Sequence, residues 1–297
     1  MNPSFRSALI IVAAFGAVSV SHAADSKSQR GGNSCASGME AQKGDRHKPL
    51  MAVGLTTDQR LICFSENRPG DARAIGAVSG LMSGDMLVGI DFRVQDGMLY
   101  GVSKAGGVYQ IDTASAAATK VSQLTVALEG TQFGVDFNPA ADRLRVVSDT
   151  GQNLRHNIGT GGVTIVDGVL NYTAGTAAAG VTGSAYTNND LNAATATTLF
   201  ALDTTLDQVA LQSPPNAGTL AATGKLGMDV AAVAGFDIYN RVRDGASVGA
   251  EALAVLGMAG ADGALYSVNL LTGKATARGT FARGDQVSDI AIPLNQD

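Results

Sequence analysis

Histidine and cysteine are scarce in this 297-residue sequence, and their scarcity excludes several kinds of site. Of three histidines, His22 and His47 precede the repeated part of the chain, so that only His156 lies within it. One histidine cannot build a histidine-rich zinc site or a two-histidine proton relay. The two cysteines likewise cannot form a metal-binding cysteine cluster. The sequence therefore offers no familiar metal or cofactor motif.

Charge is also sparse, at 16% of the residues, and the net charge is −5. The 21 lysines and arginines are scattered along the chain, whereas nucleic-acid binding needs a clustered basic surface. A nucleic-acid partner is therefore excluded. P-loop, dinucleotide-binding and EF-hand motifs are absent as well.

Long apolar runs are missing after the N-terminal region, which predicts no membrane span in the mature protein. At the N-terminus, Arg6 precedes the apolar stretch Ala8–Val20, and small residues occupy Ser21 and Ala23. This layout is typical of a secretory signal peptide, and a stretch of 13 residues is too short to be a membrane anchor. We expect a periplasmic or secreted protein. The predicted organisation is a signal peptide at 1–23, a polar flexible leader at 24–48 and one domain at 49–297.

Cys35 and Cys63 both lie in the exported portion of the chain. An oxidising compartment permits a disulfide between them, which would tie the leader to the domain. Two unpaired thiols are the alternative, and the sequence alone leaves both open.

A short pattern recurs about every fifty residues, and it is the most informative feature present. Its copies are Gly89-Ile90-Asp91-Phe92, Gly134-Val135-Asp136-Phe137, Gly183-Ser184-Ala185-Tyr186, Gly235-Phe236-Asp237-Ile238 and a degenerate Val287-Ser288-Asp289-Ile290. A regular period of this size indicates a repeat architecture. The 37 glycines and the short aliphatic segments between turn formers predict an all-β protein.

Each repeat unit accommodates four strands. In the second unit these are predicted at Gly89–Arg93, Met98–Ser103, Val108–Asp112 and Thr119–Leu124. The first unit begins with Met51–Leu55 and lacks the equivalent of the first strand, whereas the chain ends on a lone copy of it, Val287–Ile292. A solenoid would need capping repeats at both ends, not complementary fragments. The sequence thus predicts a five-bladed β-propeller, closed by the C-terminal strand completing the first blade.

Several longer motifs resemble one bacterial family. They are Gly134–Pro139, Arg143–Ser148, Thr150–Arg155, Ala185–Asn189, Pro214–Leu220 and Leu226–Val230. They look like the signature segments of the domain-of-unknown-function family DUF4394, and the resemblance covers about residues 50–294. The resemblance implies a secreted propeller and transfers no activity.

The repeats place aspartates in one column, on the innermost strand of four blades. The column comprises Asp91, Asp136, Asp237 and Asp289, with Ala185 in the fifth place. Four converging carboxylates repel one another unless they are neutralised, protonated or hydrogen-bonded. One interpretation is a site for a cation such as Ca²⁺, or for a ligand, at the mouth of the channel. The other is structural, in which each carboxylate accepts backbone N–H bonds.

A second candidate site lies in the third unit, where Asp149, Gln152, Asn153 and Arg155 share a turn-rich segment. Side chains of these types are donors and acceptors suited to a carboxylate or a sugar hydroxyl. We expect this loop on the face that carries the Asp136 end of the channel. A turn held by its own internal hydrogen bonds is the alternative.

Taken together, these features favour an exported, non-catalytic propeller that binds a ligand, or an envelope or extracellular protein partner, on one face. The alternative is a hydrolase or lyase acting on a glycan or lactone through paired carboxylates. A purely structural envelope module is a third interpretation. Gly245–Gly249 matches the G-x-S-x-G nucleophile motif. We interpret it as a chance match, because no histidine follows it in the sequence. The charged insertion Arg241–Ala250 is expected to be a loop.

Overall fold

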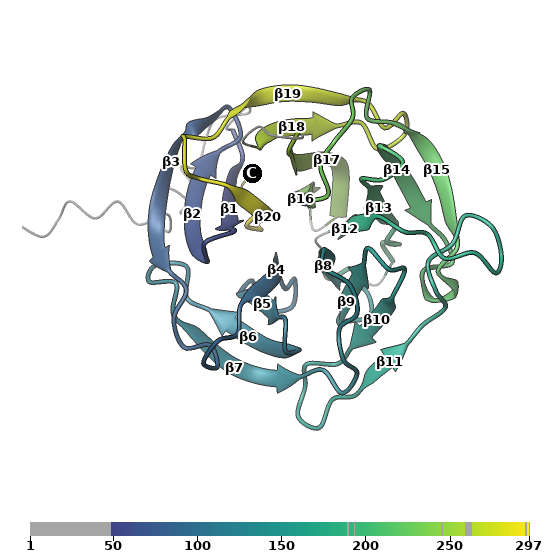
Figure 1. Ribbon diagram of the computed structural model, residues 1–297, viewed down its shortest axis with the longest axis horizontal. Coiled ribbons are helices and arrows are strands. Elements are labelled where there is room, and N and C mark those ends of the chain that lie inside the picture. The colour runs from purple at the N-terminus through teal and green to yellow at the C-terminus, as the bar shows by residue number, and fades with distance from the viewer. Residues whose placement is uncertain are drawn as a thin grey trace, which may run out of the picture. The chain divides into compact units, whose positions relative to one another are not determined.

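A computed structural model describes residues 49–188, 190–192, 194–244, 246–258, 263–294 and 296. The chain divides into two compact units, Met1–Asn33 and Ser34–Asp297, and all described residues belong to the second. The predicted signal peptide and leader lie outside the described residues. In the second unit, five four-stranded antiparallel sheets form a ring around a central axis (Figure 1). The predicted five-bladed β-propeller is confirmed.

The strands of each blade run from the axis outward. Blade 1 consists of β20 (Val287–Ala291), β1 (Met51–Thr56), β2 (Arg60–Ser65) and β3 (Arg68–Ala77). Blade 2 consists of β4 (Leu87–Phe92), β5 (Leu99–Ser103), β6 (Gly107–Ile111) and β7 (Ala118–Gln123). Blade 3 consists of β8 (Phe133–Asn138), β9 (Arg143–Ser148), β10 (Asn153–His156) and β11 (Thr164–Val166). Blade 4 consists of β12 (Val181–Tyr186), β13 (Leu199–Asp203), β14 (Gln208–Gln212) and β15 (Leu220–Lys225). Blade 5 consists of β16 (Ala234–Arg243), β17 (Ala246–Leu256), β18 (Ala264–Val268) and β19 (Ala275–Thr280).

The ring is closed within blade 1 by strands from both ends of the domain. β20 pairs with β1, and the register joins Val53 to Ala291 and Gly54 to Ile290. The hydroxyl of Ser288 adds a hydrogen bond to the carbonyl of Leu55 at 3.1 Å. The C-terminal strand β20 therefore closes the ring as predicted, because it supplies the inner strand of blade 1.

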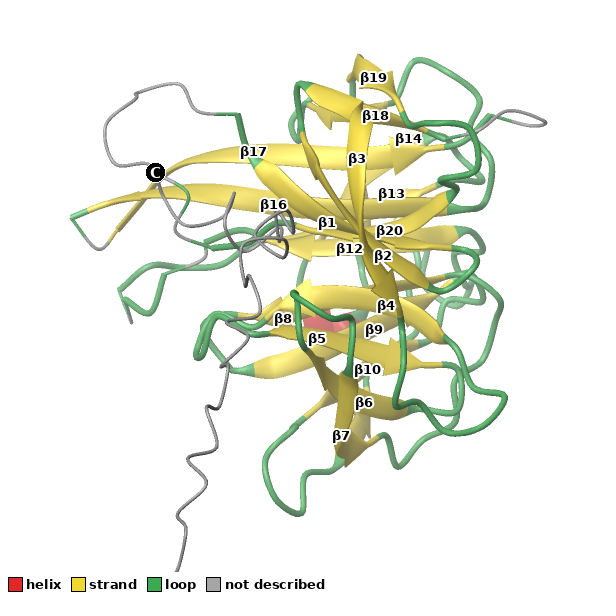
Figure 2. Cartoon of the chain, turned by 90° about the vertical axis from the view of Figure 1, so that its left-hand side faces the viewer, coloured by secondary structure: helices red, strands yellow, loops and turns green. Residues whose placement is uncertain are grey.

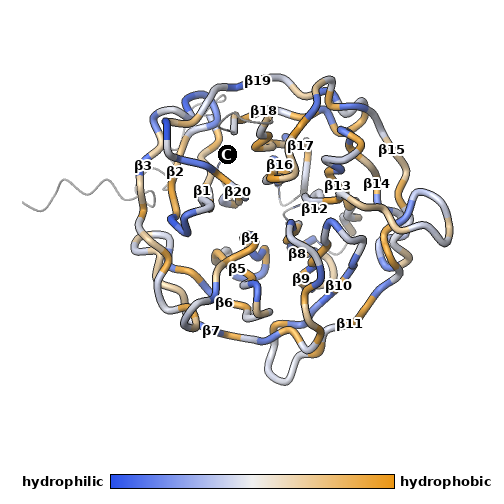
Figure 3. Tube along the Cα trace, in the orientation of Figure 1, coloured by the Kyte–Doolittle hydropathy of each residue, from blue (hydrophilic) through white to orange (hydrophobic). Residues whose placement is uncertain are grey.

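The core lies between neighbouring blades. Middle strands such as β5 are buried along their whole length, whereas the outer strand β7 is exposed at most positions. Apolar stretches recur in each of the five blades in Figure 3. Each blade therefore buries both faces against its neighbours, and separate hydrophobic clusters fill the successive interfaces.

The glycine that opens the repeat in four of the blades allows the inner strands to approach one another. A Cβ added at Gly134 would lie 2.6 Å from the amide nitrogen of Ser184. One added at Gly235 would lie 2.6 Å from the Cα of Asp289. Only a residue without a side chain fits this close contact of backbones, which explains the recurring glycine.

The segment expected to be a loop, Arg241–Ala250, is instead part of a long hairpin. β16 and β17 are 10 and 11 residues long, and they pair as far as Arg243 and Ala246. Figure 2 shows this hairpin projecting beyond the other strands on one face of the ring. The charged residues of this segment belong to a two-stranded ribbon that is exposed to solvent, and not to a loop.

Cys63 is buried in β2 and is disulfide-bonded. Cys35, which the sequence offered as its partner, lies outside the described residues. Within the described part of the chain, no helix has the length and hydrophobicity needed to cross a membrane.

Candidate functional site

The innermost strand of each blade has no neighbouring strand of its own sheet on the side of the axis. β20, β4, β8, β12 and β16 each lie at the end of their sheet. The N–H groups on this side therefore need other acceptors, because buried backbone donors are almost always hydrogen-bonded. Aspartate side chains provide them.

Asp91 and Asp136 link consecutive blades through such bonds. Asp91 accepts the N–H of Phe92, its own neighbour, and that of Phe137 in the next blade, both at 2.7 Å. Asp136 accepts the N–H of Tyr186 in blade 4 at 3.1 Å. Each carboxylate thus joins the inner strand of its blade to the inner strand that follows.

Asp237 completes the set. It accepts the N–H groups of Ile238 at 2.6 Å and of Ile292, just after β20, at 2.5 Å. Ala185 and Ala291 occupy the column in blades 4 and 1 and cannot accept. In blades 5 and 2, which follow these alanines around the ring, Asp237 and Asp91 each accept an N–H of their own strand as well as one from the next blade. Three carboxylates therefore satisfy five backbone donors, one in every blade.

Asp289 is not aligned with the other aspartates as predicted. Strand pairing places Ala291 in the column of Asp91, whereas Asp289 falls two residues earlier, in the column of Gly89. The Asp-Ile pair of β20 imitates the repeat motif, which produced the shifted alignment. Asp289 still faces the axis and accepts the N–H of Ile90 at 2.8 Å. It therefore caps blade 2 one layer away from the other three.

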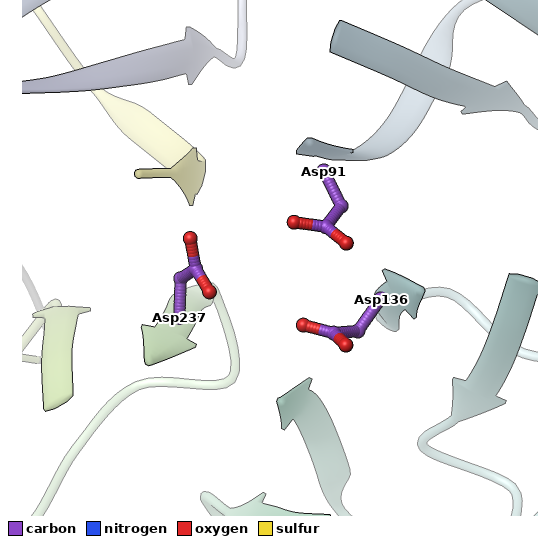
Figure 4. Close-up of side chains that lie close together, drawn as sticks. All are labelled: Asp91, Asp136 and Asp237. Atoms are coloured by element: carbon purple, nitrogen blue, oxygen red, sulfur yellow. The ribbon is translucent and has the colours of Figure 1, made fainter. Parts of the chain in front are cut away.

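The carboxylates of Asp91, Asp136 and Asp237 converge. Figure 4 shows all three pointing toward a common centre on the axis. One oxygen from each lies within 4.8 Å of the others, and all three residues are buried.

This convergence favours the neutral acids. Burial, followed by the nearby charge of Asp237, raises the pKa of Asp91 well above its ordinary value. Burial and the charges of Asp91 and Asp237 do the same for the pKa of Asp136. The pKa of Asp237 is raised by burial to about 6, although two backbone donors oppose the change. Burial also raises the pKa of Asp289. Within this cluster, charge must be removed by protons or balanced by a cation.

A small cavity opens from these carboxylates to the face on which the inner strands end. It is lined by the three aspartates and by residues that follow the inner strands: Val94, Pro139, Asn188 and Leu294. Its volume is about 10 Å³, which is roughly the room needed by one water molecule. We call the face on which it opens the mouth face.

The residues present fit a hard cation in charge and in reach. Calcium binds oxygen ligands at about 2.4 Å, so that two ligands of one ion lie at most about 4.8 Å apart. The three carboxylates meet this limit. They supply only part of a calcium coordination sphere of about 6–8 oxygens, so water would have to complete it. Asp136 is the best placed, since among the described residues its carboxylate accepts only one backbone N–H, that of Tyr186.

The second predicted site lies elsewhere. Asp149 and Gln152 are in the turn between β9 and β10, at the end of blade 3 where β8 begins. This turn is on the face opposite the mouth, because Asp136 and its cavity lie toward the end of β8. The expected placement beside the Asp136 end of the channel is therefore wrong. The expectation assumed that Asp136 lies near the start of its strand, whereas its cavity opens at the end of β8.

The polar groups of this turn are also engaged internally. Asp149 accepts the N–H groups of Thr131 and Gln132, and Gln152 bonds the backbone of Ala127 and Glu129. These contacts hold the loop that precedes β8. They match the alternative of a turn with internal hydrogen bonds.

Asn153 and Arg155 belong to a buried network centred on Arg145. Arg145 is 2% exposed and donates to Asn153 at 2.6 Å and to Asp167 at 2.7 Å. It also donates to Asn216 in blade 4 at 2.9 Å. Arg155 donates to the same Asp167 at 2.9 Å. These residues fasten blade 3 to blade 4. The sequence showed an isolated arginine in a strand, and only the fold reveals its partners.

A groove on the mouth face was not predicted. It has a volume of about 740 Å³ and lies beside the central cavity, since Thr187 lines the groove and Asn188 lines the cavity. Its walls come from the β12–β13 connection, from β17 and from the turn between β18 and β19. Its lining includes Thr187, Thr198, Ala250, Glu251, Asn269 and Lys274. They lie far apart in the sequence, which gave no signal for it.

The only histidine among the described residues has a structural environment. His156 is buried, and its two ring nitrogens contact the hydroxyls of Ser122 at 2.8 Å and Thr164 at 3.0 Å. Burial lowers its pKa. Ser247 of the G-x-S-x-G match lies in strand β17, outside any strand–turn–helix elbow.

Comparison with known proteins identifies a matching family and solved structures of low sequence identity. A family model described as "Domain of unknown function (DUF4394)" matches residues 60–291. No curated protein is similar enough to count as a relative.

Three solved structures illustrate the distant similarity. TolB from Acinetobacter baumannii is 13% identical, with a TM-score of 0.43, and the match covers 78% of this chain and 53% of that one. An auxiliary nutrient binding protein from Bacteroides thetaiotaomicron is 13% identical, with a TM-score of 0.39, over 69% and 55% of the two chains. A structural genomics protein of unknown function from the same organism is 10% identical, with a TM-score of 0.42, over 60% and 45%. The match thus spans about half the length of these proteins. Similarity at this level assigns no ligand or partner to this chain.

Proposed function

We propose that this chain, which belongs to the DUF4394 family, is an exported, non-catalytic β-propeller that binds a ligand or a protein partner on its mouth face. The groove of about 740 Å³ carries the proposal. Its volume falls within the range of roughly 300–1,000 Å³ found for binding pockets.

The two faces of the ring differ in a way that supports this choice. On the mouth face, the β16–β17 hairpin projects beyond the other strands (Figure 2). Ala250 and Glu251 of this hairpin line the groove. On the opposite face, the polar side chains of the β9–β10 turn bond to neighbouring backbone. A rigid ring that presents an irregular surface on one side is the usual arrangement for binding.

The geometry favours binding over the hydrolase or lyase alternative. Glycoside cleavage by two carboxylates requires a sugar ring between them, at separations of about 5–9.5 Å. Here the oxygens of three aspartates lie within 4.8 Å, and their cavity of about 10 Å³ has no room for a sugar. These carboxylates also accept the N–H groups of the inner strands.

The same three carboxylates support a second element of the proposal, a cation at the channel mouth. A hard cation such as Ca²⁺ would balance charges that burial makes unfavourable. It would stabilise the ring, and its role would be structural. Thermal unfolding of the wild type and of Asp136→Asn, each with calcium and with a chelator, tests this role.

Site-specific photo-crosslinking in the producing cell tests the binding face. A benzophenone amino acid at Val248, which is 59% exposed on the hairpin, should crosslink to a partner protein. The matched control is the same amino acid at Leu206, which is 42% exposed in the β13–β14 turn on the opposite face. Crosslinks at Leu206 and none at Val248 would place the binding surface on the wrong face and overturn the proposal.

Export is tested on the same preparation. If residues 1–23 are a signal peptide, the intact mass of the protein in the periplasm or medium should correspond to residues 24–297. Recovery of an uncleaved chain in the cytoplasm would refute this part.

A further inference from the structure

The hairpin of blade 5 carries a strand edge that the rest of the blade does not cover. β18 pairs with β17 only as far as Ala252, which faces Val268. β17 continues to Ala246 and pairs there with β16 alone. Among the described residues, no strand therefore lies along the outer edge of β17 between Ala246 and Glu251.

The direction of the backbone groups on this edge follows from the register. The N–H of Ile238 points to the axis, where Asp237 accepts it, so Tyr239 is the residue that pairs with β17 through hydrogen bonds. Its partner is Glu251. Backbone groups alternate along a strand, so the N–H and C=O of Ala250 point to the uncovered edge.

One donor of this edge already has an acceptor from the neighbouring blade. Asp190, in the β12–β13 connection, accepts the N–H of Ser247 at 3.0 Å and its hydroxyl at 2.8 Å. The bulge between Arg241 and Val242 turns the N–H of Ser247 outward. Asp190 thus closes the end of the edge nearest the hairpin tip, and the stretch from Val248 to Glu251 is left open.

The groove lies along this open stretch. Ala250 and Glu251 line it together with Thr187 and Thr198 of blade 4 and the β18–β19 turn. At about 3.3 Å per residue, four residues of β17 offer an edge of about 13 Å. The open edge in the groove is therefore long enough to pair with a short added strand.

The groove also carries a charge without a partner. Lys274, in its wall, is exposed and forms no ion pair or hydrogen bond through its side chain with any described residue. Glu251 by contrast is paired with Arg241 at 3.4 Å and with Arg278 at 3.3 Å. The charge left for an incoming group is thus positive.

From these observations we propose that a partner protein docks a short extended segment in this groove, paired with the backbone of Ala250 and bearing an acidic side chain toward Lys274. The inference rests on the proposed function and names the kind of partner. Strand addition to an exposed sheet edge provides affinity through main-chain hydrogen bonds, and side-chain contacts provide selectivity. Asp190 already shows a carboxylate serving one backbone donor of the same edge.

A second copy of the chain is a less suitable occupant. The open stretch ends at the β18–β19 turn on one side and at Asp190 on the other. A single segment fits between these limits, whereas a second hairpin would bring an additional strand and its own Asp190 connection. Dimerisation through this edge is an outcome that the experiment detects.

The probe is a phage-displayed library of random eight-residue peptides, selected on the complete exported protein. Selected peptides are expected to contain an acidic residue, and their dissociation constants are measured by fluorescence anisotropy. Lys274→Glu and Ala250→Pro should each weaken binding by about tenfold or more, because one reverses the charge and the other removes the N–H. Lys120→Glu is the matched control, since it makes the same charge reversal at an exposed position of β7 in blade 2, outside the groove, and it should leave the dissociation constant within about twofold.

Thermal unfolding of each variant shows whether it is folded. Lys274→Glu changes an exposed side chain and keeps the test valid if Ala250→Pro does not fold. Absence of selected peptides, or peptides that bind wild type and Lys274→Glu equally, would overturn the inference. A dimer in sedimentation analysis that Ala250→Pro dissociates would overturn it too. Crosslinking at Val248 is independent of these results and decides the proposed function separately.

Discussion

At the scale of residues, the three central aspartates differ in how many backbone donors they serve. Asp91 and Asp237 each accept two N–H groups, whereas Asp136 accepts one. Aspartate has two oxygens for this purpose and asparagine has one. The same substitution should therefore have different effects at these positions.

Asp91→Asn should lower the free energy of unfolding by about 1–3 kcal/mol, because one buried N–H loses its acceptor. Asp136→Asn should change it by less than about 1 kcal/mol without calcium, since one oxygen suffices and a charge is removed from the cluster. Chemical denaturation in the presence of a chelator measures both. Equal destabilisation by the two variants would contradict this account of the donors.

The pH dependence follows from the direction of the pKa shifts. Burial raises the pKa of all four aspartates above the unfolded value of about 3.9, and that of Asp237 to about 6. Their contribution to stability is complete below the unfolded pKa and is lost as pH rises through the folded one. Calcium-free protein should therefore melt at a higher temperature at pH 5 than at pH 8, by at least about 2–4 °C.

Calcium should reduce this difference by raising the melting temperature at pH 8, because a bound cation favours the ionised carboxylates. Asp136→Asn should show a smaller calcium effect. An equal calcium effect in both proteins, or none in either, would remove the cation from the proposal.

The sequence predicted the aspartate column but not its exact membership. The repeat identified Asp91, Asp136 and Asp237 and the competing roles of their carboxylates. It misplaced Asp289 by two residues, because register depends on pairing with β1 and not on local similarity. The partners of Arg145 were beyond reach for a related reason, as they come from another strand and another blade.

At the scale of elements, the β16–β17 hairpin is the main departure from expectation. Its residues 241–250 combine charges, glycines and a bulge, and these hide the alternation typical of a strand. The hairpin is held to blade 4 by Asp190 bonding Ser247 and by Asn188 bonding Asn240 at 3.1 Å. Loss of one of these contacts should therefore loosen the hairpin without unfolding the ring.

Asp190→Ala should speed amide hydrogen exchange at Ser247 and leave the melting temperature within about 1 °C, because the lost bonds lie outside the interblade core. Asp149→Ala is the matched control on the opposite face, where it should affect exchange at Thr131 and Gln132 only. If Asp190→Ala lowered the melting temperature of the entire ring, the hairpin would be part of the global folding unit.

At the scale of the whole molecule, the fold was accessible from sequence because the two ends of the domain carry complementary fragments of one blade. Met51–Thr56 lacks an inner neighbour, and Val287–Ala291 supplies it. The groove was not accessible, since it is assembled from blades 4 and 5 and its residues have no shared motif. Repetition reveals architecture, whereas a binding surface depends on where the repeats differ.

Closure also makes the stability of the ring a property of all five blades. Removal of residues after Gln286 would expose the edge of β1 and leave the N–H of Ile90 without its acceptor Asp289. It would also remove the N–H of Ile292 that Asp237 accepts. Loss of β20 should therefore lower the melting temperature of the entire domain in one cooperative transition. Calorimetry of the truncated and complete proteins measures this. A truncated protein with an unchanged melting curve would show that closure by β20 does not stabilise the ring, whatever the pairing.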